Sequence, residues 1–212
     1  MMVNEELLKL ITERVMEKVV NYNTYKIPLG VSNRHVHVTR EDLETLFGKG
    51  YELTVKGELK QPGQFASNET VTIRGPKGEF ERVRILGPVR KQSQIEISKT
   101  DSFRLGVKAL IRESGDLSGT PGLELVGPKG TVLLPQGAIV ALRHIHMTPQ
   151  QAEAMGVWDK DIVEVETFGE RHGVFGDVLI RVSDQFELEM HVDVDEANAC
   201  ALKNNDYVII RH

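Results

Sequence analysis

Two short stretches of the sequence repeat one histidine pattern. "SNRHVHVT" places His35 and His37 two positions apart, and "ALRHIHMT" does the same with His144 and His146. Residues i and i+2 of a β-strand project from the same face, roughly 6.5 Å apart, so each pair can aim both imidazoles at one side. Four of the seven histidines lie in these two pairs, which makes them the first candidates for metal-binding chemistry.

The repetition extends beyond the histidines and indicates an internal duplication. The two pairs lie 109 positions apart, and each is preceded by an apolar strand pattern and followed by an amphipathic helix pattern. Further along, "QIEIS" aligns with "EMHVD" at an offset of 95, so the first half carries an insertion of about 14 residues (109 minus 95) within 52–68. The alignment lays His191 on Glu96 and gives each half a third candidate ligand.

Imidazole nitrogens and carboxylate oxygens at about 2.0–2.2 Å suit zinc, and a set without cysteine thiolates is typical of a catalytic site with open positions. Six ligands are too many for one tetrahedral ion that must also hold substrate. Two ions, or one ion with the other groups in acid–base or substrate roles, fit the pattern better. A single H-x-H on a strand is more often an exposed or hydrogen-bonded pair, and it is the matching second copy that favours metal.

Further candidates surround these positions. Arg90 lies six residues before Glu96, beside Lys91, and its planar fork could clamp a carboxylate or phosphate, although a plain surface arginine is an equal alternative. The Ser/Gly-rich stretch "RESGDLSGTPG", residues 112–122, is typical of a loop that admits or covers a ligand. The remaining candidates are expected to be structural or surface residues: Arg34, Arg143, His172, Cys200 and His212.

Short β patterns must position these side chains. From residue 27 onward, β-branched and aliphatic runs are separated by hairpin-turn signals at 75–78, 127–130 and 169–173. A short helix is predicted after each histidine pair, in "TREDLETLFG" and "TPQQAEAMGV". Residues 4–20 form a further amphipathic pattern, and "NYNTYK" is expected to be a linker. The G-x-G-x-x-G, G-x-x-x-x-G-K-[ST] and G-x-S-x-G motifs do not occur.

Composition narrows the function classes. The 212 residues are 40% hydrophobic and 27% charged, ordinary values for a globular protein. The net charge of -5 argues against a general nucleic-acid binder, which needs a basic surface. A single cysteine, with neither a long apolar run nor a secretory signal pattern, predicts a cytoplasmic location.

The motifs together resemble one family. "IPLGVSNRHVHVT", "GPVRKQSQIEIS", "RESGDLSGTPG", "ALRHIHMTPQQA" and "MHVDVDEANA" are similar to the PduL-type phosphotransacylases, also called phosphate propanoyltransferases, over nearly the whole chain. The resemblance implies a mainly β fold of two tandem duplicated β-barrel domains with short capping α-helices. It also implies that the chain interconverts propanoyl-CoA or another short acyl-CoA plus phosphate with acyl phosphate plus CoA, in propanediol degradation.

The resemblance also implies residue roles. The phosphate-binding, catalytic arginine of the family matches Arg90, and a serine of its active-site loop matches Ser114. Its Zn²⁺ ligands, for two ions, match His35, His37, Glu96, His144, His146 and His191. The expected mechanism is direct transfer with both substrates bound. One zinc stabilises the departing CoA thiolate, while the other, with Arg90, holds the phosphate that attacks the thioester carbon.

The family's organisation implies three segments. Residues 1–22 would be an N-terminal amphipathic helix, similar to an encapsulation peptide, with its linker. Residues 34–141 would form the first barrel, and residues 23–33 plus 142–212 the second. The expected partners are a short-chain acyl-CoA, phosphate, further copies of the chain in a homo-oligomer, and shell proteins of a bacterial microcompartment, with neither nucleic acid nor a membrane among them.

Two other function classes stay open. A zinc hydrolase of a small amide or thioester would use the same ligands to activate water. A non-catalytic protein stabilised by metal would bind the ions without consuming acyl-CoA. The N-terminal helix likewise has an alternative role as a lid packed on its own domain.

Overall fold

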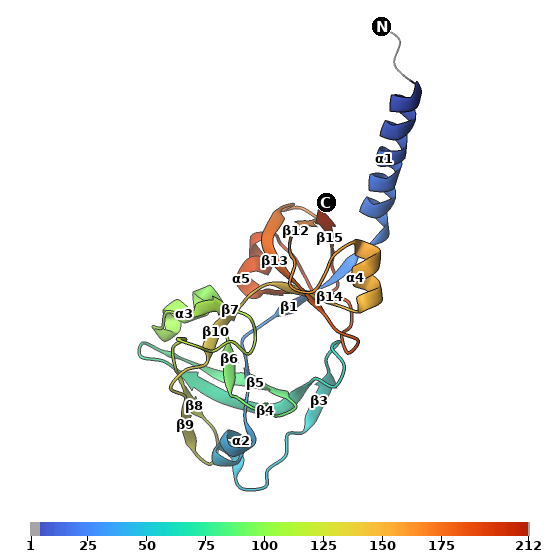
Figure 1. Ribbon diagram of the computed structural model, residues 1–212. Helices are drawn as coiled ribbons and strands as arrows, with labels where there is room; N and C mark the ends of the chain where they lie inside the picture. Colours follow the sequence, from blue (N-terminus) through green and yellow to red (C-terminus); the bar gives the residue numbers. More distant parts are fainter. Residues whose placement is uncertain (1–4, 212) are drawn as a thin grey trace.

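Two β units lie next to each other, and a long N-terminal helix projects from one of them (Figure 1). The computed structural model describes the backbone of residues 5–211 and the side chains of residues 7–16 and 25–211. The predicted mainly β fold with short capping helices is confirmed: one unit is a closed six-stranded barrel and the other is a nine-stranded sheet. His212 lies outside the described residues.

The nine-stranded sheet carries the first histidine pair on a central strand. β2 pairs in parallel with β5 on one side and antiparallel with β6 on the other. β3 pairs with β4, at the side of the sheet. In spatial order across the sheet, the strands are β7 (Leu110–Arg112), β10 (Ala138–Ala141), β6 (Gln94–Glu96), β2 (His35–His37), β5 (Glu79–Gly87), β4 (Phe65–Arg74), β8 (Glu124–Val126) and β9 (Thr131–Leu133). The ninth strand, β3 (Val55–Glu58), lies outside this order.

The barrel carries the second histidine pair in an equivalent setting. β11 pairs in parallel with β13 and antiparallel with β14, which repeats the neighbours of β2. The barrel closes where β1 meets β15. In spatial order its strands are β1 (Ile27–Ser32), β14 (Glu189–Asp193), β11 (His144–Met147), β13 (Val174–Val182), β12 (Ile162–Thr167) and β15 (Tyr207–Arg211).

Each histidine strand is preceded by a strand that lies in the other unit. β1 pairs in parallel with β14 of the barrel, whereas β10 pairs in parallel with β6 of the nine-stranded sheet. The chain therefore crosses between the units immediately before His35 and again immediately before His144. We propose from this exchange that residues 34–141 form one domain, that 23–33 plus 142–212 form the other, and that 1–22 are an N-terminal extension.

Short helices follow the strands that carry the candidate ligands. The two helices predicted after the histidine pairs are confirmed, and Thr39 and Thr148 cap them by accepting hydrogen bonds from the N–H groups of Asp42 and Gln151. Each of these two helices begins within three residues of the end of its histidine strand, and so fixes where that strand ends. The helices are α1 (Glu5–Thr24), α2 (Arg40–Phe47), α3 (Lys99–Leu105), α4 (Pro149–Met155) and α5 (Val194–Ala199).

α1 is longer than predicted. It continues through Thr24, so most of "NYNTYK" is helical and the expected linker is correspondingly shorter. Asn, Tyr and Thr are moderate helix formers and not breakers, and elongation of an existing helix adds a hydrogen bond for each residue that is ordered. None of the helices in residues 5–211 combines the length and apolar character needed to cross a bilayer.

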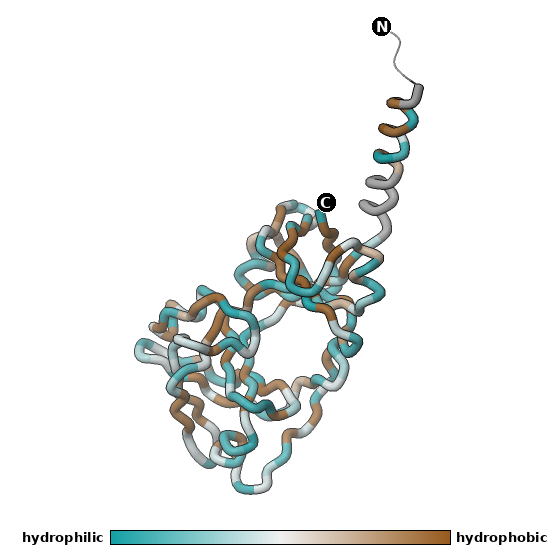
Figure 2. The backbone as a smooth tube through the Cα atoms, in the orientation of Figure 1, coloured by the Kyte–Doolittle hydropathy of each residue, from teal (hydrophilic) through white to brown (hydrophobic). Residues whose placement is uncertain are grey.

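Each unit has its own apolar core, and hydrophobic stretches run through both (Figure 2). Val36 and Ile95 are fully buried in the nine-stranded sheet, and Ile145 and Met190 hold the equivalent places in the barrel. These residues alternate with the candidate ligands along their strands, so burying them turns the ligands to the opposite face. Burial of each such side chain contributes roughly 1.5–3 kcal/mol.

The hairpin turns predicted at 75–78, 127–130 and 169–173 are confirmed by the strands that flank them. The predicted insertion corresponds to β3 and the segment that joins it to β4, a combination without an equivalent among the barrel strands. We call residues 55–64 the arm. The side chain of Gln61 on the arm donates a 3.0 Å hydrogen bond to the carbonyl of Glu187, so the arm links the first unit to the second.

Candidate metal centre

The first cluster is built by two neighbouring antiparallel strands. His35 lies directly opposite Glu96 in the register of β2 and β6. Glu96 Oε2 is 3.5 Å from His35 Nε2, and Glu96 Oε1 is 3.9 Å from His37 Nε2. Each of the three residues offers a ligand atom within 4.8 Å of the others. One imidazole pair and one carboxylate thus converge on a volume that a single cation could fill.

The second cluster repeats this geometry with an imidazole in place of the carboxylate. His144 lies opposite His191 in the register of β11 and β14, and their rings are parallel, with centroids 5.1 Å apart. His146 completes the group, again with all three ligand atoms within 4.8 Å. The lateral pairing of His35 with Glu96 and of His144 with His191 matches the sequence alignment of Glu96 with His191.

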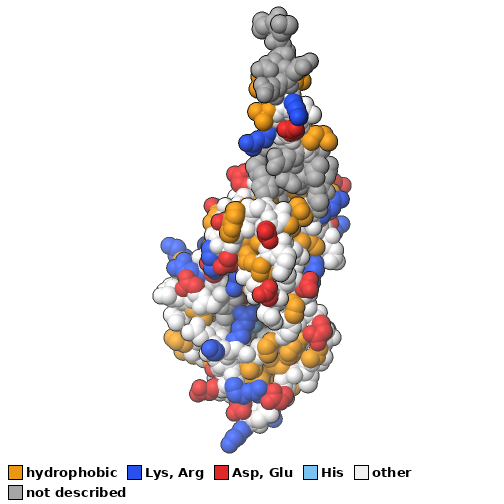
Figure 3. Space-filling model, turned by 45° about the vertical axis from the view of Figure 1, so that its right-hand side comes forward, with side chains coloured by type: hydrophobic (Ala, Val, Ile, Leu, Met, Phe, Trp, Pro, Cys, Tyr) orange, Lys and Arg blue, Asp and Glu red, His pale blue; other side chains and the backbone are white. Residues whose placement is uncertain are grey.

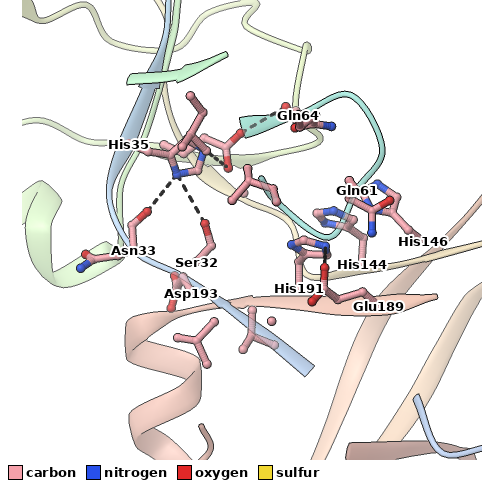
Figure 4. A pocket seen from close by; sticks show the side chains of 18 of the residues that line it. Ser32, Asn33, His35, Gln61, Gln64, His144, His146, Glu189, His191 and Asp193 are labelled. Atoms are coloured by element: carbon pink, nitrogen blue, oxygen red, sulfur yellow. Dashed lines mark hydrogen bonds and ion pairs between the residues drawn. The ribbon is translucent and has the colours of Figure 1, made fainter. Parts of the chain in front are cut away.

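Both clusters open into one cleft between the two units. The cleft has a volume of about 590 Å³ and is lined by all six ligand candidates, together with Arg90, Ser114 and Arg181. The labelled histidines of both clusters face this region in Figure 4. Basic side chains gather in the hollow between the units (Figure 3), which suits an anionic ligand.

Electrostatics keep Glu96 ionised despite its burial. Burial by itself would raise the pKa of the Glu96 carboxyl, but His35, His37 and Arg90 hold that pKa far below its usual range. Burial would also lower the pKa of His35, but the charge of Glu96 and its hydrogen bond outweigh this and raise it. The pKa of His37 lies well below its usual value because of burial and the neighbouring His35 and Arg90. The first cluster therefore offers a carboxylate beside a neutral imidazole.

Two imidazoles of the second cluster, those of His144 and His146, are neutral at pH 7. Burial and the neighbouring His191 lower the pKa of His144 to about 4, and burial with the neighbouring His144 and His191 lowers the pKa of His146 to about 2. A neutral imidazole keeps a lone pair on one ring nitrogen, which is the form that binds metal.

Buried ring nitrogens without hydrogen-bond partners test whether a metal fits. Nδ1 of His35 lies 2.9 Å from the carbonyl of Asn33, and Nδ1 of His144 lies 2.7 Å from that of Leu142. In the neutral form of either ring, the proton is therefore on Nδ1 and Nε2 carries the lone pair that a cation would bind. Among the described side chains, the buried polar atoms without a well-aligned hydrogen bond are His37 Nδ1, His146 Nδ1 and His191 Nε2, and the last of these lies 3.1 Å from Glu189 Oε2. All three belong to the clusters, which is the pattern expected of ligands to cations.

Arg90 and Ser114 lie beside the first cluster. Arg90 Nη1 donates a 3.2 Å hydrogen bond to Ser114 Oγ, and this hydroxyl in turn donates a 3.2 Å bond to Glu96 Oε1. Burial lowers the pKa of Arg90, the charge of Glu96 raises it in part, and the charge of Arg181 lowers it further. The guanidinium nevertheless stays protonated in proteins. Arg90 can thus hold an anion close to the cation cluster while Ser114 fixes its position.

Sequence reasoning missed Glu189 and Arg181, which line this cleft, and Gln94, which contacts Glu96 and Ser114 beside it. Gln94 Nε2 donates 2.6 Å and 2.8 Å hydrogen bonds to Glu96 Oε1 and Ser114 Oγ, and Gln94 Oε1 accepts one from the N–H of Gly115. Strand alternation could have identified Gln94 and Glu189. Each lies two residues before a candidate ligand, Glu96 or His191, and therefore points to the same face of its strand. Arg181 has no equivalent signal, since the matching position of the first half is Leu86.

The residues expected to be structural lie outside the clusters. Arg34 makes a two-pronged ion pair with Asp101 of α3, at 2.7 and 2.9 Å, and Arg143 Nη1 lies 3.3 Å from Glu196 Oε1 of α5. These equivalent pairs tie the start of each histidine strand to a capping helix. The exposed His172 lies 2.7 Å from Glu166 in a turn, and Cys200 packs partly buried against the barrel core.

Comparison with known proteins gives a consistent result. The family model described as phosphate propanoyltransferase matches residues 28–203. The chain is 58% identical to the phosphate propanoyltransferase of Thermotoga maritima, over 95% of this chain and 99% of that protein. Proteins of the same name from Lachnoclostridium phytofermentans and Clostridioides difficile are 52% and 50% identical, covering 96% and 92% of this chain and 97% and 93% of their own lengths.

Proposed function

The chain belongs to the phosphate propanoyltransferase family, whose members are phosphotransacylases, and from this premise we propose the reaction of its cleft. The chain converts propanoyl-CoA or another short acyl-CoA, together with phosphate, into acyl phosphate and CoA, and catalyses the reverse. The single observation that carries this proposal is the meeting of two metal-type clusters and the Arg90–Ser114 pair in one cleft.

The six clustered side chains are proposed to hold two divalent cations, and zinc suits their nitrogen and oxygen donors. His35, His37 and Glu96 would hold one ion, and His144, His146 and His191 the other. Bound there, the ions supply Lewis-acid stabilisation of negative charge on sulfur and phosphate oxygens. The unpaired ring nitrogens and the ionised Glu96 support this assignment.

The protein's own groups position the reactants. The Arg90 guanidinium donates one hydrogen bond to Ser114, and its other N–H groups are available to bind phosphate. A phosphate oxygen then attacks the thioester carbonyl carbon, the C–S bond breaks, and CoA leaves as the thiolate. Holding both substrates in one cleft makes this attack effectively unimolecular, so the proposal requires no acyl-serine or acyl-cysteine.

A thiol-release assay with acetyl-, propanoyl- and butanoyl-CoA, each with and without phosphate, tests the function. Thiol release should depend on phosphate and be matched by acyl phosphate. A zinc hydrolase would release thiol at the same rate without phosphate, and a metal-stabilised scaffold would consume none of the three thioesters. The assay also ranks the acyl chains.

We further propose that α1 binds shell proteins of a bacterial microcompartment. The helix projects from the barrel (Figure 1), and its described apolar side chains are about half exposed, including Leu7, Leu10, Ile11 and Met16. An unburied apolar face on a soluble body is typical of a segment that docks on a partner.

Deleting residues 1–22 tests this role. The truncated protein should keep its transferase rate, because the clusters and Arg90 lie elsewhere, but should no longer co-purify with co-expressed shell proteins. A Lys9→Ala variant of the full chain serves as a control that leaves the apolar face intact. Shell association of the truncated protein at the full-length level would exclude the helix as the docking segment.

A further inference from the structure

The two clusters differ at two alternating strand positions. In the nine-stranded sheet these positions hold Gln94 and Glu96, and in the barrel they hold Glu189 and His191. Each half therefore has one carboxylate in this pair of positions. It is at the second position in the first half (Glu96) and at the first position in the second half (Glu189). Since the rest of each cluster consists of histidines, this exchange determines where negative charge meets each proposed cation.

In the first half the carboxylate is itself a candidate ligand and an amide supports it. Gln94 lies opposite His37 in the strand register and donates its 2.6 Å hydrogen bond to Glu96 Oε1. Gln94 is almost completely buried, so this orientation is fixed within the protein.

In the second half the order is reversed. Glu189 lies opposite His146 in the register, and its Oε2 is 3.1 Å from His191 Nε2 (Figure 4). Glu189 is 8% exposed. A carboxylate is costly to bury without a positive partner. The cationic partner closest to it among the described side chains is Lys60 of the arm, 3.8 Å away and 39% exposed at its side chain.

The backbone beside Glu189 is adapted to hold this carboxylate. In the first half the strand residue beside Glu96 is Ile139, whereas in the second half the residue beside His191 is Gly30. A Cβ atom on Gly30 would lie 2.9 Å from Glu189 Oε1 and 3.0 Å from its Cδ. The absence of a side chain at Gly30 therefore leaves the space that the Glu189 carboxylate occupies. The equivalent position of the first half holds Ile139, so this place in the strand can accept a large side chain where no such carboxylate lies beside it.

We propose that Glu189 is a positioning residue that supplies the second cation site with the negative charge that Glu96 gives to the first as a ligand. Glu189 acts through His191, whose ring it orients, as carboxylates behind metal-binding histidines do. Lys60 completes the arrangement from the arm. The inference rests on the proposed function, because it presupposes that both clusters hold cations.

Zinc titration of the metal-free protein, with a chromophoric chelator as competitor, tests the inference. The parent protein should bind two equivalents tightly. Glu189→Gln should weaken one of them about 10–100-fold, the usual effect of losing such a partner, and leave the other unchanged. The double variant Glu189→Gln/His191→Glu recreates the first-half pattern and should restore the weakened equivalent to within about threefold of the parent. Glu187→Gln is the control, since Glu187 is two residues earlier and exposed.

The outcomes separate this inference from the function beneath it. A parent protein that binds no zinc would overturn the metal assignment of the proposed function. Two tight equivalents in both the parent and Glu189→Gln would overturn the role of Glu189 alone. A failure of the folded double variant to regain the weakened equivalent would also overturn it, since the charge would then have been restored without effect. Circular dichroism of the metal-free variants identifies any that fail to fold.

Discussion

His144→Ala is expected to lower the rate of acyl transfer at least tenfold and to reduce bound zinc from two equivalents towards one. His144 is partly buried in the second cluster, faces His191 across the strand pair, and has its Nδ1 fixed by the carbonyl of Leu142. Alanine at this position leaves two of the three ligands, too few for a stable tetrahedral site. Elemental analysis of the dialysed protein and the phosphate-dependent thiol-release rate measure the two effects.

The exposed His172 provides the matched control for this prediction. Because it lies in a turn outside both clusters, His172→Ala should keep both zinc equivalents and the parent rate. His144 is partly buried whereas His172 is exposed, so thermal unfolding of the metal-free proteins must show that His144→Ala still folds. A folded His144→Ala protein with full activity and two zinc equivalents would contradict the assignment of the second cluster.

Arg90→Ala is expected to raise the phosphate concentration needed for half-maximal rate at least tenfold, while bound zinc stays at the parent level. The arginine donates to Ser114 beside Glu96, and it contributes charge and directional donors without occupying a ligand position. A tenfold change corresponds to about 1.4 kcal/mol of lost interaction with the anion, which is close to the lower end of the range for one charged hydrogen bond. Initial rates over a phosphate series, at saturating acyl-CoA, measure it.

The neighbouring Lys91 distinguishes a specific clamp from general attraction. Lys91 is exposed, so Lys91→Ala removes the same charge next in sequence and should change the phosphate requirement less than twofold. Arg90→Lys should recover only part of the loss, because an ammonium cannot donate the paired hydrogen bonds of a guanidinium. Equal phosphate saturation in Arg90→Ala and the parent would remove Arg90 from this role.

The sequence alone determined which residues form the clusters and which strands carry them. Strand alternation places His35 with His37 and His144 with His146 on single faces, and this local rule does not depend on the rest of the fold. The duplication then identified Glu96 and His191, because equivalent positions of a repeat occupy equivalent places in the structure. The hairpin turns and the short helices after the histidine pairs were also predictable from local signals, since glycine in a turn and threonine at a helix start act through their own backbone neighbours.

Tertiary structure decided how the two halves meet, and before it only the family resemblance placed residues 23–33 with residues 142–212. The exchange of β1 and β10 between the units depends on pairing between strands more than 40 residues apart, and local pattern carries no information on such partners. The contacts of Gln94 and Glu189 were likewise hidden, because their alternation with the ligands gives a direction but not a neighbour. The space beside Gly30 exists only once β1 lies against β14. Local rules thus fix which way each side chain points, and long-range packing fixes what it meets.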